Sequence, residues 1–496
     1  MEHGPVLEAT PLGHDAACDV AVIGSGIAGL SIAYELTRLG RQVIVIDRGP
    51  IGLGMTARST AHLSSSLDDL YTNLIGIHGR DTARLLLDSQ VAAINRVEAI
   101  CAAEKLEVDF QRVEGWMAAT TPEEEAKLKD EYEACLSIGM HVTWADRSAA
   151  TGLGKGPALV FPRQARFHPL KYLSGLATVL QEHGTRLFAY TAYESHDKSD
   201  GRILIQTGTG AVISAAHAVF ATNSPVNAGR AFHSKQRPDR TYVIAAPIPK
   251  GSVDDVLFWD MLDPYHHMRI QPLDDIWDRL IIGGEDHRTG TESDMAQRLA
   301  RLEDWARAHY PAMGEVSHRW SGQILETLDY MPFSGRAPGE DNIYLHTGDA
   351  GQGITNAVAG ALVIAPLIAG QHARFAPILD PSRAPLTGRT IAHYLADQAG
   401  VVAGLVQHLA PGEVASPGEI APGEGAVLRN GALAREAVYR SPDGDVIRLS
   451  ATCTHAGCGV RWNSFEKCWD CPCHGSQYAP TGEVLSGPAL KPLPKI

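Results

Sequence analysis

Apolar and polar positions recur along the chain with two periods, which predict where helices and strands lie. An apolar strand at 18–23 runs through a glycine-rich turn into an amphipathic helix, and a second apolar strand occupies 42–46. Apolar residues at helical spacing predict a helix over 81–104. The run Thr-Pro-Glu-Glu-Glu begins a further helix over 121–138, because proline and acids favour the first turn. An almost wholly apolar helix over 356–369 is too short to span a bilayer.

Two further regions have the composition of sheet. Residues 159–175 and 240–285 are rich in aromatic and β-branched side chains, and we expect them to build one antiparallel sheet. Near the end of the chain, 423–428 and 434–440 read as short strands, and 443–445 as a hairpin turn after the second of them.

The length of the chain predicts more than one domain. At 496 residues it exceeds what a single ordinary core accommodates, so two domains are expected and three are possible. Hydrophobic residues make up 44% and charged residues 20%, and there are 49 glycines, a profile typical of a loop-rich α/β enzyme.

The charge balance and the N-terminus exclude several functions. A net charge of −14 disfavours nucleic acids and anionic membranes as partners, because both attract basic surfaces. Residues 1–17 lack a basic segment followed by an apolar run, and no apolar stretch is long enough for a membrane span. We therefore expect a cytoplasmic enzyme. The sequence does not determine an oligomeric state.

The glycine-rich turn after the first strand predicts a dinucleotide site. Gly24 permits the tight turn, Gly26 lets a pyrophosphate approach the helix N-terminus, and Gly29 lets helix and strand pack closely. The second strand ends at Asp47, 23 residues after Gly24, where an acid binds ribose hydroxyls. The motif by itself leaves FAD, NAD and an unliganded glycine-rich turn open.

Two boxes near the C-terminus predict a metal centre. Cys453 and His455 in CTHAGC, with Cys471 and His474 in CPCHGS, place two thiolates and two imidazoles on two loops. Such a ligand set suits an iron–sulfur cluster or zinc. A structural zinc site would not require additional cysteines at matching positions of both boxes, nor the Gly and Ser that follow the second.

The two boxes resemble those of Rieske proteins. The resemblance implies that Cys453, His455, Cys471 and His474 bind a [2Fe–2S] cluster, and that Cys458 and Cys473 form a disulfide joining the two loops. Ser476 and Tyr478 fall where high-potential Rieske proteins donate hydrogen bonds to sulfur, and Gly487-Pro488-Ala489 is similar to their proline loop.

The longer part of the chain resembles the D-amino-acid-oxidase-like flavoenzymes. Residues 52–62 resemble the segment that crosses the flavin, 221–223 a second contact near the adenine, and 344–355 the last FAD motif. Three motifs in family order favour FAD over NAD, and a second complete glycine motif for a nicotinamide is absent. The FAD contacts expected from motif and resemblance are Gly24, Gly26, Gly29, Asp47, Arg48, Arg58, Ser59, Thr60, Thr222, Gly348, Asp349, Gly351, Gln352, Gly353, Ile354 and Thr355.

Catalytic candidates follow from the same resemblance. Alternation after Pro264 predicts that Tyr265, His267 and Arg269 share one face of a strand, and in the resembled enzymes such a strand faces the flavin while Arg or Tyr holds the substrate carboxylate. The alternative is that these are ordinary sheet residues. His62 stands where dimethylglycine and sarcosine dehydrogenases link histidine to the flavin, or it forms a hydrogen bond to flavin or substrate.

Together these features predict a fusion with an α/β FAD-binding Rossmann-type domain, an antiparallel-sheet substrate domain and a small all-β Rieske domain. The expected divisions are a tail at 1–17, the FAD-dependent oxidoreductase at 18–385 with nucleotide-binding parts near 18–75, 200–230 and 335–370, a linker helix at 386–412 and the Rieske domain at 413–496. The expected activity is oxidation of a C–N bond in a small amine or amino acid, with electrons leaving through the cluster to an external carrier. The alternatives are a redox or electron-transfer protein, or a reductase or oxygenase whose electrons enter through the cluster.

Overall fold

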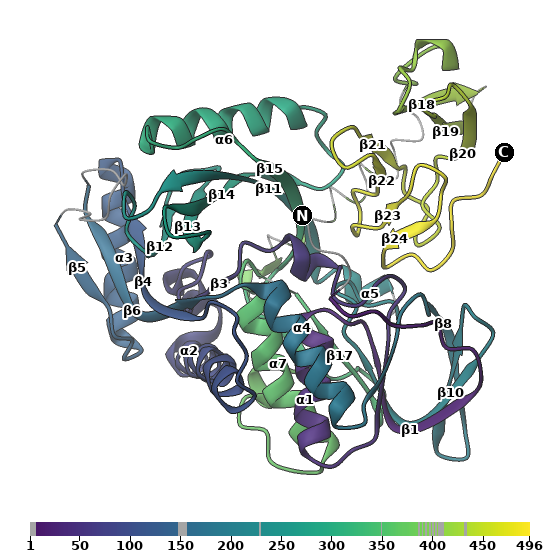
Figure 1. The fold of residues 1–496 in the computed structure, drawn as a ribbon, viewed down its shortest axis with the longest axis horizontal. Helices are drawn as coiled ribbons and strands as arrows, with labels where there is room; N and C mark the ends of the chain where they lie inside the picture. The colour runs from purple at the N-terminus through teal and green to yellow at the C-terminus, as the bar shows by residue number, and fades with distance from the viewer. Residues whose placement is uncertain are drawn as a thin grey trace.

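The computed structural model describes residues 6–146, 156–227, 230–348, 350–384, 411–430 and 434–496, with isolated positions between 387 and 404. Figure 1 shows two large sheets with their helices, and small C-terminal strands beside them. We call 6–384 the N-terminal segment and 411–496 the C-terminal segment. The linker helix predicted over 386–412 falls mostly outside the described residues.

The first large sheet has eight strands in a Rossmann-type arrangement. Five neighbouring strands are parallel, and antiparallel strands are added through β16 and β9. Its strands are β1 (Ala16–Ile23), β2 (Val43–Ile46), β7 (Arg186–Phe188), β8 (Tyr193–Ser199), β9 (Arg202–Thr207), β10 (Val212–Phe220), β16 (Phe333–Arg336) and β17 (Ile343–Thr347). Strand β2 is buried at every position and β1 is buried throughout Val20–Ile23, as expected where helices cover a parallel sheet.

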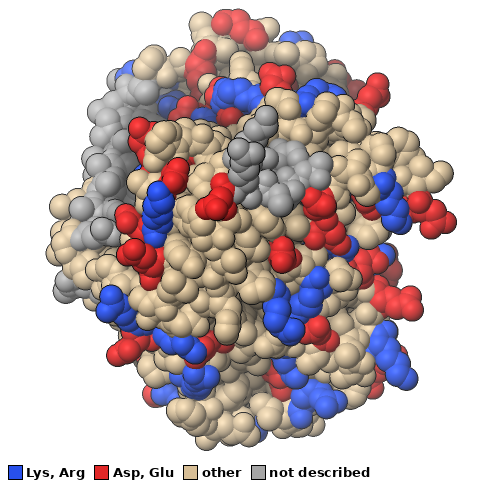
Figure 2. All heavy atoms as spheres, turned by 90° about the vertical axis from the view of Figure 1, so that its left-hand side faces the viewer, with Lys and Arg blue, Asp and Glu red and all other residues tan. Residues whose placement is uncertain are grey.

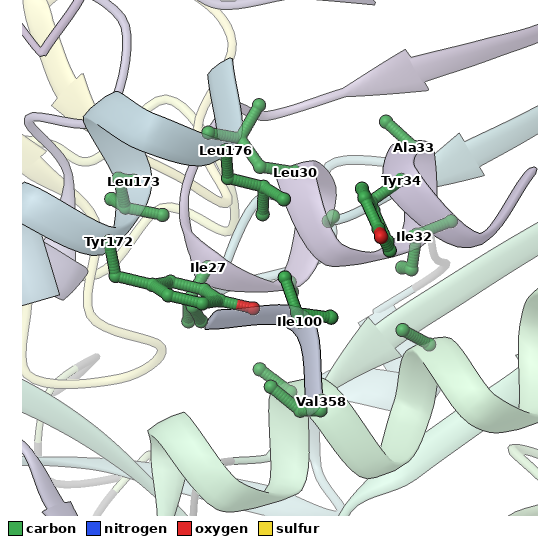
Figure 3. Packing of buried hydrophobic residues seen from close by; sticks show 14 of the residues in the cluster. Ile27, Leu30, Ile32, Ala33, Tyr34, Ile100, Tyr172, Leu173, Leu176 and Val358 are labelled. Carbon is green, nitrogen blue, oxygen red and sulfur yellow. The ribbon is translucent and has the colours of Figure 1, made fainter. Parts of the chain in front are cut away.

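Helices pack around α1 beside this sheet. Figure 3 shows Ile27 and Leu30 of α1 facing Tyr172 and Leu176 of α4, with Val358 of α7 close by. The helices are α1 (Ile27–Arg38), α2 (Tyr71–Ala103), α3 (Pro122–Ser137), α4 (Pro169–Glu182), α5 (Arg230–His233), α6 (Met295–His309), α7 (Gly353–Ile368) and α8 (Ala376–Leu379), with short 3₁₀ turns η1 (Met55–Arg58) and η3 (Pro417–Glu419). The close approach of α1 to β1 requires Gly29, because a Cβ there would lie 1.8 Å from the Gly24 carbonyl oxygen.

Of two predicted helices, one begins earlier than expected and the other begins at the predicted position. Helix α2 begins at Tyr71, earlier than predicted, with a break at Gly79, where φ is 79°. Helix α3 begins as expected after Thr121, whose hydroxyl accepts from the Glu124 N–H while the Glu124 carboxylate accepts from the Thr121 N–H.

The second large sheet has nine strands and is mainly antiparallel. Its strands are β3 (His62–Leu63), β4 (Gln111–Ala118), β5 (Thr143–Ala145), β6 (Ala158–Arg166), β11 (Gln236–Pro249), β12 (Leu257–Asp260), β13 (His266–Pro272), β14 (Trp277–Arg288) and β15 (His318–Thr327). The prediction of a sheet over 240–285 is therefore confirmed.

The prediction of sheet over 159–175 is only half right. Strand β6 ends at Arg166, and the chain then forms α4. Pro169 occupies the first helical turn, the His168 ring caps that turn by accepting from the Lys171 N–H, and buried apolar residues continue at helical spacing. Composition alone did not reveal this helix start.

The C-terminal segment forms two small antiparallel sheets. The first contains β18 (Glu424–Asn430), β19 (Ala434–Arg440) and β20 (Val446–Ser450), and the second β21 (Arg461–Asn463), β22 (Cys468–Asp470), β23 (Gln477–Tyr478) and β24 (Val484–Ser486). The predicted turn at 443–445 lies between β19 and β20. The all-β expectation for this part of the chain is confirmed.

A buried ion pair joins the two segments. Arg240 of β11 donates to both carboxylate oxygens of Asp470 of β22, at 3.1 and 2.9 Å, and both side chains are 2% exposed. Burial is the largest influence and acts to lower the pKa of Arg240, but Asp470 and, after it, Cys468, Glu466 and Tyr242 together raise it. A second pair joins Arg58 to Glu466 at 2.7 Å. The C-terminal segment is therefore docked on β11 and β15, as Figure 1 shows.

Two observations concern apolar helices and surface charge. Among the described residues, no helix combines the length and apolarity needed to cross a bilayer. On the described part of the face in Figure 2, acidic and basic side chains are interspersed. The exclusion of a nucleic-acid partner stays a prediction.

Replacing Arg240 by Met tests how strongly the ion pair holds the segments. The change leaves the buried Asp470 carboxylate without its cation, so we expect urea unfolding to show a loss of about 3–5 kcal/mol. Lys129→Met removes the exposed pair with Glu125 and should cost about 1 kcal/mol or less. Equal losses in both variants would contradict the docking role of Arg240.

Candidate functional site

A cavity of about 720 Å³ lies where the two large sheets meet the C-terminal segment. Its walls include the glycine turn after β1, the η1 turn, the start of β13 and the start of α7. Glu466, Cys468, Gln477 and residues 484–487 of the C-terminal segment also line it. Both segments therefore contribute to one site.

The nucleotide end of the cavity has the geometry that the glycine motif predicts. Gly24 and Gly26 line it, and a Cβ on Gly24 would lie 2.3 Å from the Ala221 carbonyl oxygen. Gly26 has no side chain that could cap helix α1, and the Ile27 N–H donates to the Thr56 hydroxyl at 3.0 Å. The other N–H groups of the first turn lie beside a glycine backbone without side chains, a cradle suited to a pyrophosphate, so the residues present fit a dinucleotide.

Asp47 and Arg48 lie next to this cradle. The Asp47 carboxylate accepts from the Ser25 N–H at 2.7 Å, the Ser25 hydroxyl at 2.6 Å and the Gly49 N–H at 3.0 Å. The Arg48 guanidinium donates to the Val484 carbonyl at 3.3 Å, and burial lowers the pKa of Arg48. Both residues line the cavity, with Arg48 also contacting the C-terminal segment.

Most of the other predicted FAD contacts line the same cavity. These are Arg58, Ser59, Thr60, Thr222, Gly351, Gln352, Gly353 and Ile354. Gly29, Gly348 and Thr355 do not line it: Gly29 packs α1 on β1, Gly348 packs against Thr327, and Thr355 is fully buried. Asp349 lies outside the described residues.

Three aromatic rings stand at the end of the cavity formed by the second sheet. The His62 ring meets the His267 ring edge to face at 5.3 Å, and Tyr265 stacks on His267 at 5.5 Å. Burial lowers the pKa of His62 well below its usual value and that of His267 to about 4, so both imidazoles are neutral. The two nitrogens of His62 lie 3.2 Å from the Thr60 hydroxyl and 3.3 Å from the Met268 carbonyl. Both ring nitrogens therefore have partners within the protein, and a hydrogen bond from His62 to flavin or substrate and the covalent link to flavin both stay predictions.

Arg269 does not reach the cavity. It is 2% exposed, and its guanidinium donates to the carbonyls of Thr60 and Ile270 and to the Gln271 side chain. The donors of Arg269 are therefore used to hold β13 against the chain before His62. This matches the alternative stated above, in which Arg269 is an ordinary sheet residue. On the opposite face of β13, His266 stacks on Trp305 at 4.4 Å.

The sequence reasoning missed Asp68 as a residue of this site. Asp68 lines the cavity, its carboxylate accepts from the Gln352 amide at 3.2 Å, and it is also hydrogen-bonded to Tyr265. Burial raises the pKa of Asp68 to about 6. The feature of the sequence that could have indicated this residue is the acidic pair Asp68-Asp69, which directly follows Ser64-Ser65-Ser66-Leu67.

The four predicted cluster ligands come together in the C-terminal segment. The Cys453 and Cys471 thiols are buried and hydrogen-bonded to one another, which lowers the pKa of Cys453. The His455 and His474 rings meet edge to face at 4.9 Å. Two free thiols facing each other beside two adjacent imidazoles fit a [2Fe–2S] cluster with mixed ligands.

Cys458 and Cys473 are joined by a disulfide, as the resemblance implies. Their Cα atoms are 6.5 Å apart, and the bond ties the two ligand loops together. The sulfurs of Cys458, Cys471 and Cys473 lie within 4.8 Å of one another, but the two disulfide-bonded cysteines have no thiolate to offer a metal. Only Cys471 of this group remains a ligand candidate.

Polar donors surround the ligand sulfurs. The Tyr478 hydroxyl lies 3.1 Å from the Cys453 sulfur and accepts from the Thr454 N–H at 3.1 Å. The Ser476 hydroxyl is hydrogen-bonded to Cys453 and accepts from the Ala489 N–H at 3.0 Å, which ties in the proline loop.

The ligand histidines also contact the N-terminal segment. The His233 ring of α5 lies 4.8 Å from the His455 ring and 5.7 Å from the His474 ring, and His233 is 1% exposed. Gln323 of β15 donates to the Gly475 carbonyl at 3.1 Å. The sequence carried no local signal for these contacts between distant residues.

Two family models match the chain. One, described as FAD dependent oxidoreductase and abbreviated DAO, matches residues 19–367, and one described as Rieske [2Fe-2S] domain matches residues 412–496. The chain is 31% identical over 495 residues to a putative Rieske 2Fe-2S iron-sulfur protein, YhfW, of Bacillus subtilis, covering 98% of this chain and 94% of that protein.

More distant relatives share the N-terminal part. Gamma-glutamylputrescine oxidoreductase of Escherichia coli is 26% identical over 428 residues, covering 79% of this chain and 95% of that protein. Among solved structures, glycine oxidase from Geobacillus kaustophilus superimposes with a TM-score of 0.63 at 19% identity, covering 74% of this chain and 99% of that chain. At this sequence identity, the similarity to glycine oxidase shows a shared fold only.

Gly26→Ala tests the nucleotide cradle. The added Cβ would lie 3.2 Å from the Thr56 hydroxyl, at the helix N-terminus that a pyrophosphate must approach. We expect the affinity of the apoprotein for FAD to fall roughly tenfold or more, equivalent to about 1.4 kcal/mol, in an equilibrium flavin titration. Gly13→Ala, whose Cβ meets no atom within 4 Å, is the control; equal affinities would exclude this role for Gly26.

Tyr478→Phe tests the hydrogen bond to Cys453. A donor to sulfur stabilises the reduced cluster, so its loss should lower the reduction potential by several tens of millivolts, since about 1.4 kcal/mol corresponds to about 59 mV for one electron. A redox titration followed by EPR measures the shift. Tyr439→Phe, whose ring packs on Trp462, should leave the potential unchanged. A potential that stays constant in Tyr478→Phe would disprove the assignment.

Proposed function

Because this chain belongs to the family of FAD-dependent oxidoreductases and carries a Rieske [2Fe–2S] domain, we propose that it oxidises a C–N bond of a small amine or amino acid and passes the electrons through its cluster to an external carrier. The family implies bound FAD, and the Rieske domain implies a [2Fe–2S] cluster. The substrate, the carrier and the direction of electron flow are the proposed part.

One observation supports the proposal above all. The segment that holds the cluster-ligand candidates is docked on the oxidoreductase segment and supplies part of the wall of its cavity. A cluster that served only an unrelated partner would not need such docking. Electron exchange between two groups depends on their proximity, and one rigid chain fixes that proximity for every turnover.

When bound, FAD supplies a two-electron acceptor for a C–N bond and the cluster a one-electron carrier. The residues supply binding and position. Gly24, Gly26 and the N-terminus of α1 would hold the pyrophosphate, and Asp47 would hold the ribose hydroxyls. His62 and His267, both neutral, leave the substrate end without positive charge from imidazole.

The residues of the C-terminal segment hold and tune the cluster. Cys453, Cys471, His455 and His474 are its proposed ligands, and Tyr478 donates to the Cys453 sulfur. Donors to sulfur favour a higher reduction potential, which suits an acceptor of electrons from a flavoprotein.

An anaerobic titration tests the proposal. The purified holoenzyme is mixed with a panel of amines and amino acids while flavin absorbance and the low-temperature EPR signal of the reduced cluster are followed. We expect one substrate to bleach the flavin and the cluster signal to follow. In Cys471→Ser, which removes one proposed ligand, the same substrate should still bleach the flavin without the EPR signal.

The opposite order of events would overturn the proposal. If no amine or amino acid bleaches the flavin, while a reduced ferredoxin fills the cluster first and the flavin afterwards, electrons enter through the cluster and the chain is a reductase or oxygenase component.

A further inference from the structure

We propose that the substrate is a cationic amine without a carboxylate beside the reacting C–N bond, and that Asp68 is the residue that selects it by binding its ammonium group. This inference rests on the proposed oxidation of a C–N bond and narrows the substrate class. The inference is based on the charged side chains at one end of the cavity, where the second large sheet forms the wall.

Asp68 presents its carboxylate to the cavity. Its side chain is exposed to this space, and a Cβ on Gly351 would lie 2.0 Å from its Oδ2, so α7 and its preceding turn fix the carboxylate in place. The Gln352 amide at 3.2 Å and Tyr265 are its hydrogen-bond partners, both neutral. A carboxylate with neutral partners keeps its capacity to pair with a cation.

The cations around the cavity are committed elsewhere. Among the described lining residues, the permanent cations are Arg48 and Arg58. Arg48 stands beside Asp47 at the nucleotide end, and Arg58 is paired with Glu466 at 2.7 Å. Arg269 behind the wall donates to Thr60, Ile270 and Gln271. A substrate carboxylate next to Asp68 would therefore be buried without a partner cation, which is unfavourable.

Other carboxyl groups crowd this end. Asp69, Asp286 and Glu326 lie around Tyr265 and, after burial, act with Asp68 to raise the pKa of its phenol. Burial first, and neighbouring carboxylates after it, raise the pKa of Asp69 to about 7 and that of Glu326 well above its usual value, while Arg237 acts in the opposite sense on both. Carboxyl groups crowded in this way disfavour an approaching anion and favour a cation.

The neighbouring rings suit a cation as well. Tyr265, His267 and Trp259 all line the cavity, and ring faces attract ammonium groups.

The test measures binding without turnover. Butyltrimethylammonium has no N–H and cannot form an imine, and pentanoate is its anionic counterpart of similar length. Each is titrated into the oxidised holoenzyme, and binding is followed by calorimetry and by the change in the visible flavin spectrum. We expect the cation to bind and pentanoate to bind at least tenfold more weakly.

Two matched variants assign the effect to Asp68. Asp68→Asn removes the charge and keeps the size, so the affinity for butyltrimethylammonium should fall at least tenfold. Asp130→Asn removes an exposed carboxyl group of α3 that does not line the cavity, and should change the affinity less than threefold. The flavin content and melting temperature of each variant check that it is folded.

The outcomes separate this inference from the proposed function. Tighter binding of pentanoate, or an unchanged affinity for the cation in folded Asp68→Asn, overturns the inference even if amino acids are oxidised. Cation binding that depends on Asp68, without oxidation of any amine, supports the inference on binding and contradicts the proposed reaction.

Discussion

The buried ion pair between Arg240 and Asp470 is the contact on which the arrangement of the two segments depends. Taking two charges out of water is costly, and attraction repays that cost only where the remaining donors and acceptors are also satisfied. Here Asn463 and Gln477 donate to Asp470, and Arg240 donates to the Ser321 hydroxyl, while the Arg240 Nε has no partner among the described residues. Such a pair requires one orientation, because any other docking would leave both charges unpaired.

The docked orientation brings the candidate cluster ligands next to the segment that forms the nucleotide cavity. Ser321 donates to Glu466, which also pairs with Arg58 on the cavity wall, so the ion pair is continuous with the site. On the other side of the docked segment, the rings of His455 and His474 lie against His233. The interface therefore connects the proposed cluster ligands with the segment that binds FAD, and the charges that hold it are not available to a substrate.

Local spacing explains which parts of this account were predictable from sequence. The glycine turn and the two Cys/His boxes place their residues within a few positions, so backbone geometry alone brings them together. The helix α4 was missed because aromatic and β-branched residues before it, such as Val160, Phe161 and Phe167, dominate the composition of the first half of 159–175, while His168 and Pro169 set the helix start. Arg240 and Asp470 are 230 positions apart, and Asp68 meets Gln352 across 284, so only the fold reveals these pairs. For Arg269 the local pattern was not sufficient. Alternation along the strand was predicted, but the Arg269 guanidinium donates to backbone carbonyls and does not reach the cavity.

The concentration dependence of cluster reduction tests the central claim, that electrons pass between flavin and cluster within one docked chain. The holoenzyme is mixed anaerobically with an oxidisable amine, and freeze-quenched samples are followed by EPR over a tenfold range of protein concentration. The account predicts that, once the flavin is reduced, the cluster signal grows with a first-order rate that is independent of protein concentration. A rate that increases in proportion to protein concentration would show transfer between molecules and contradict the account.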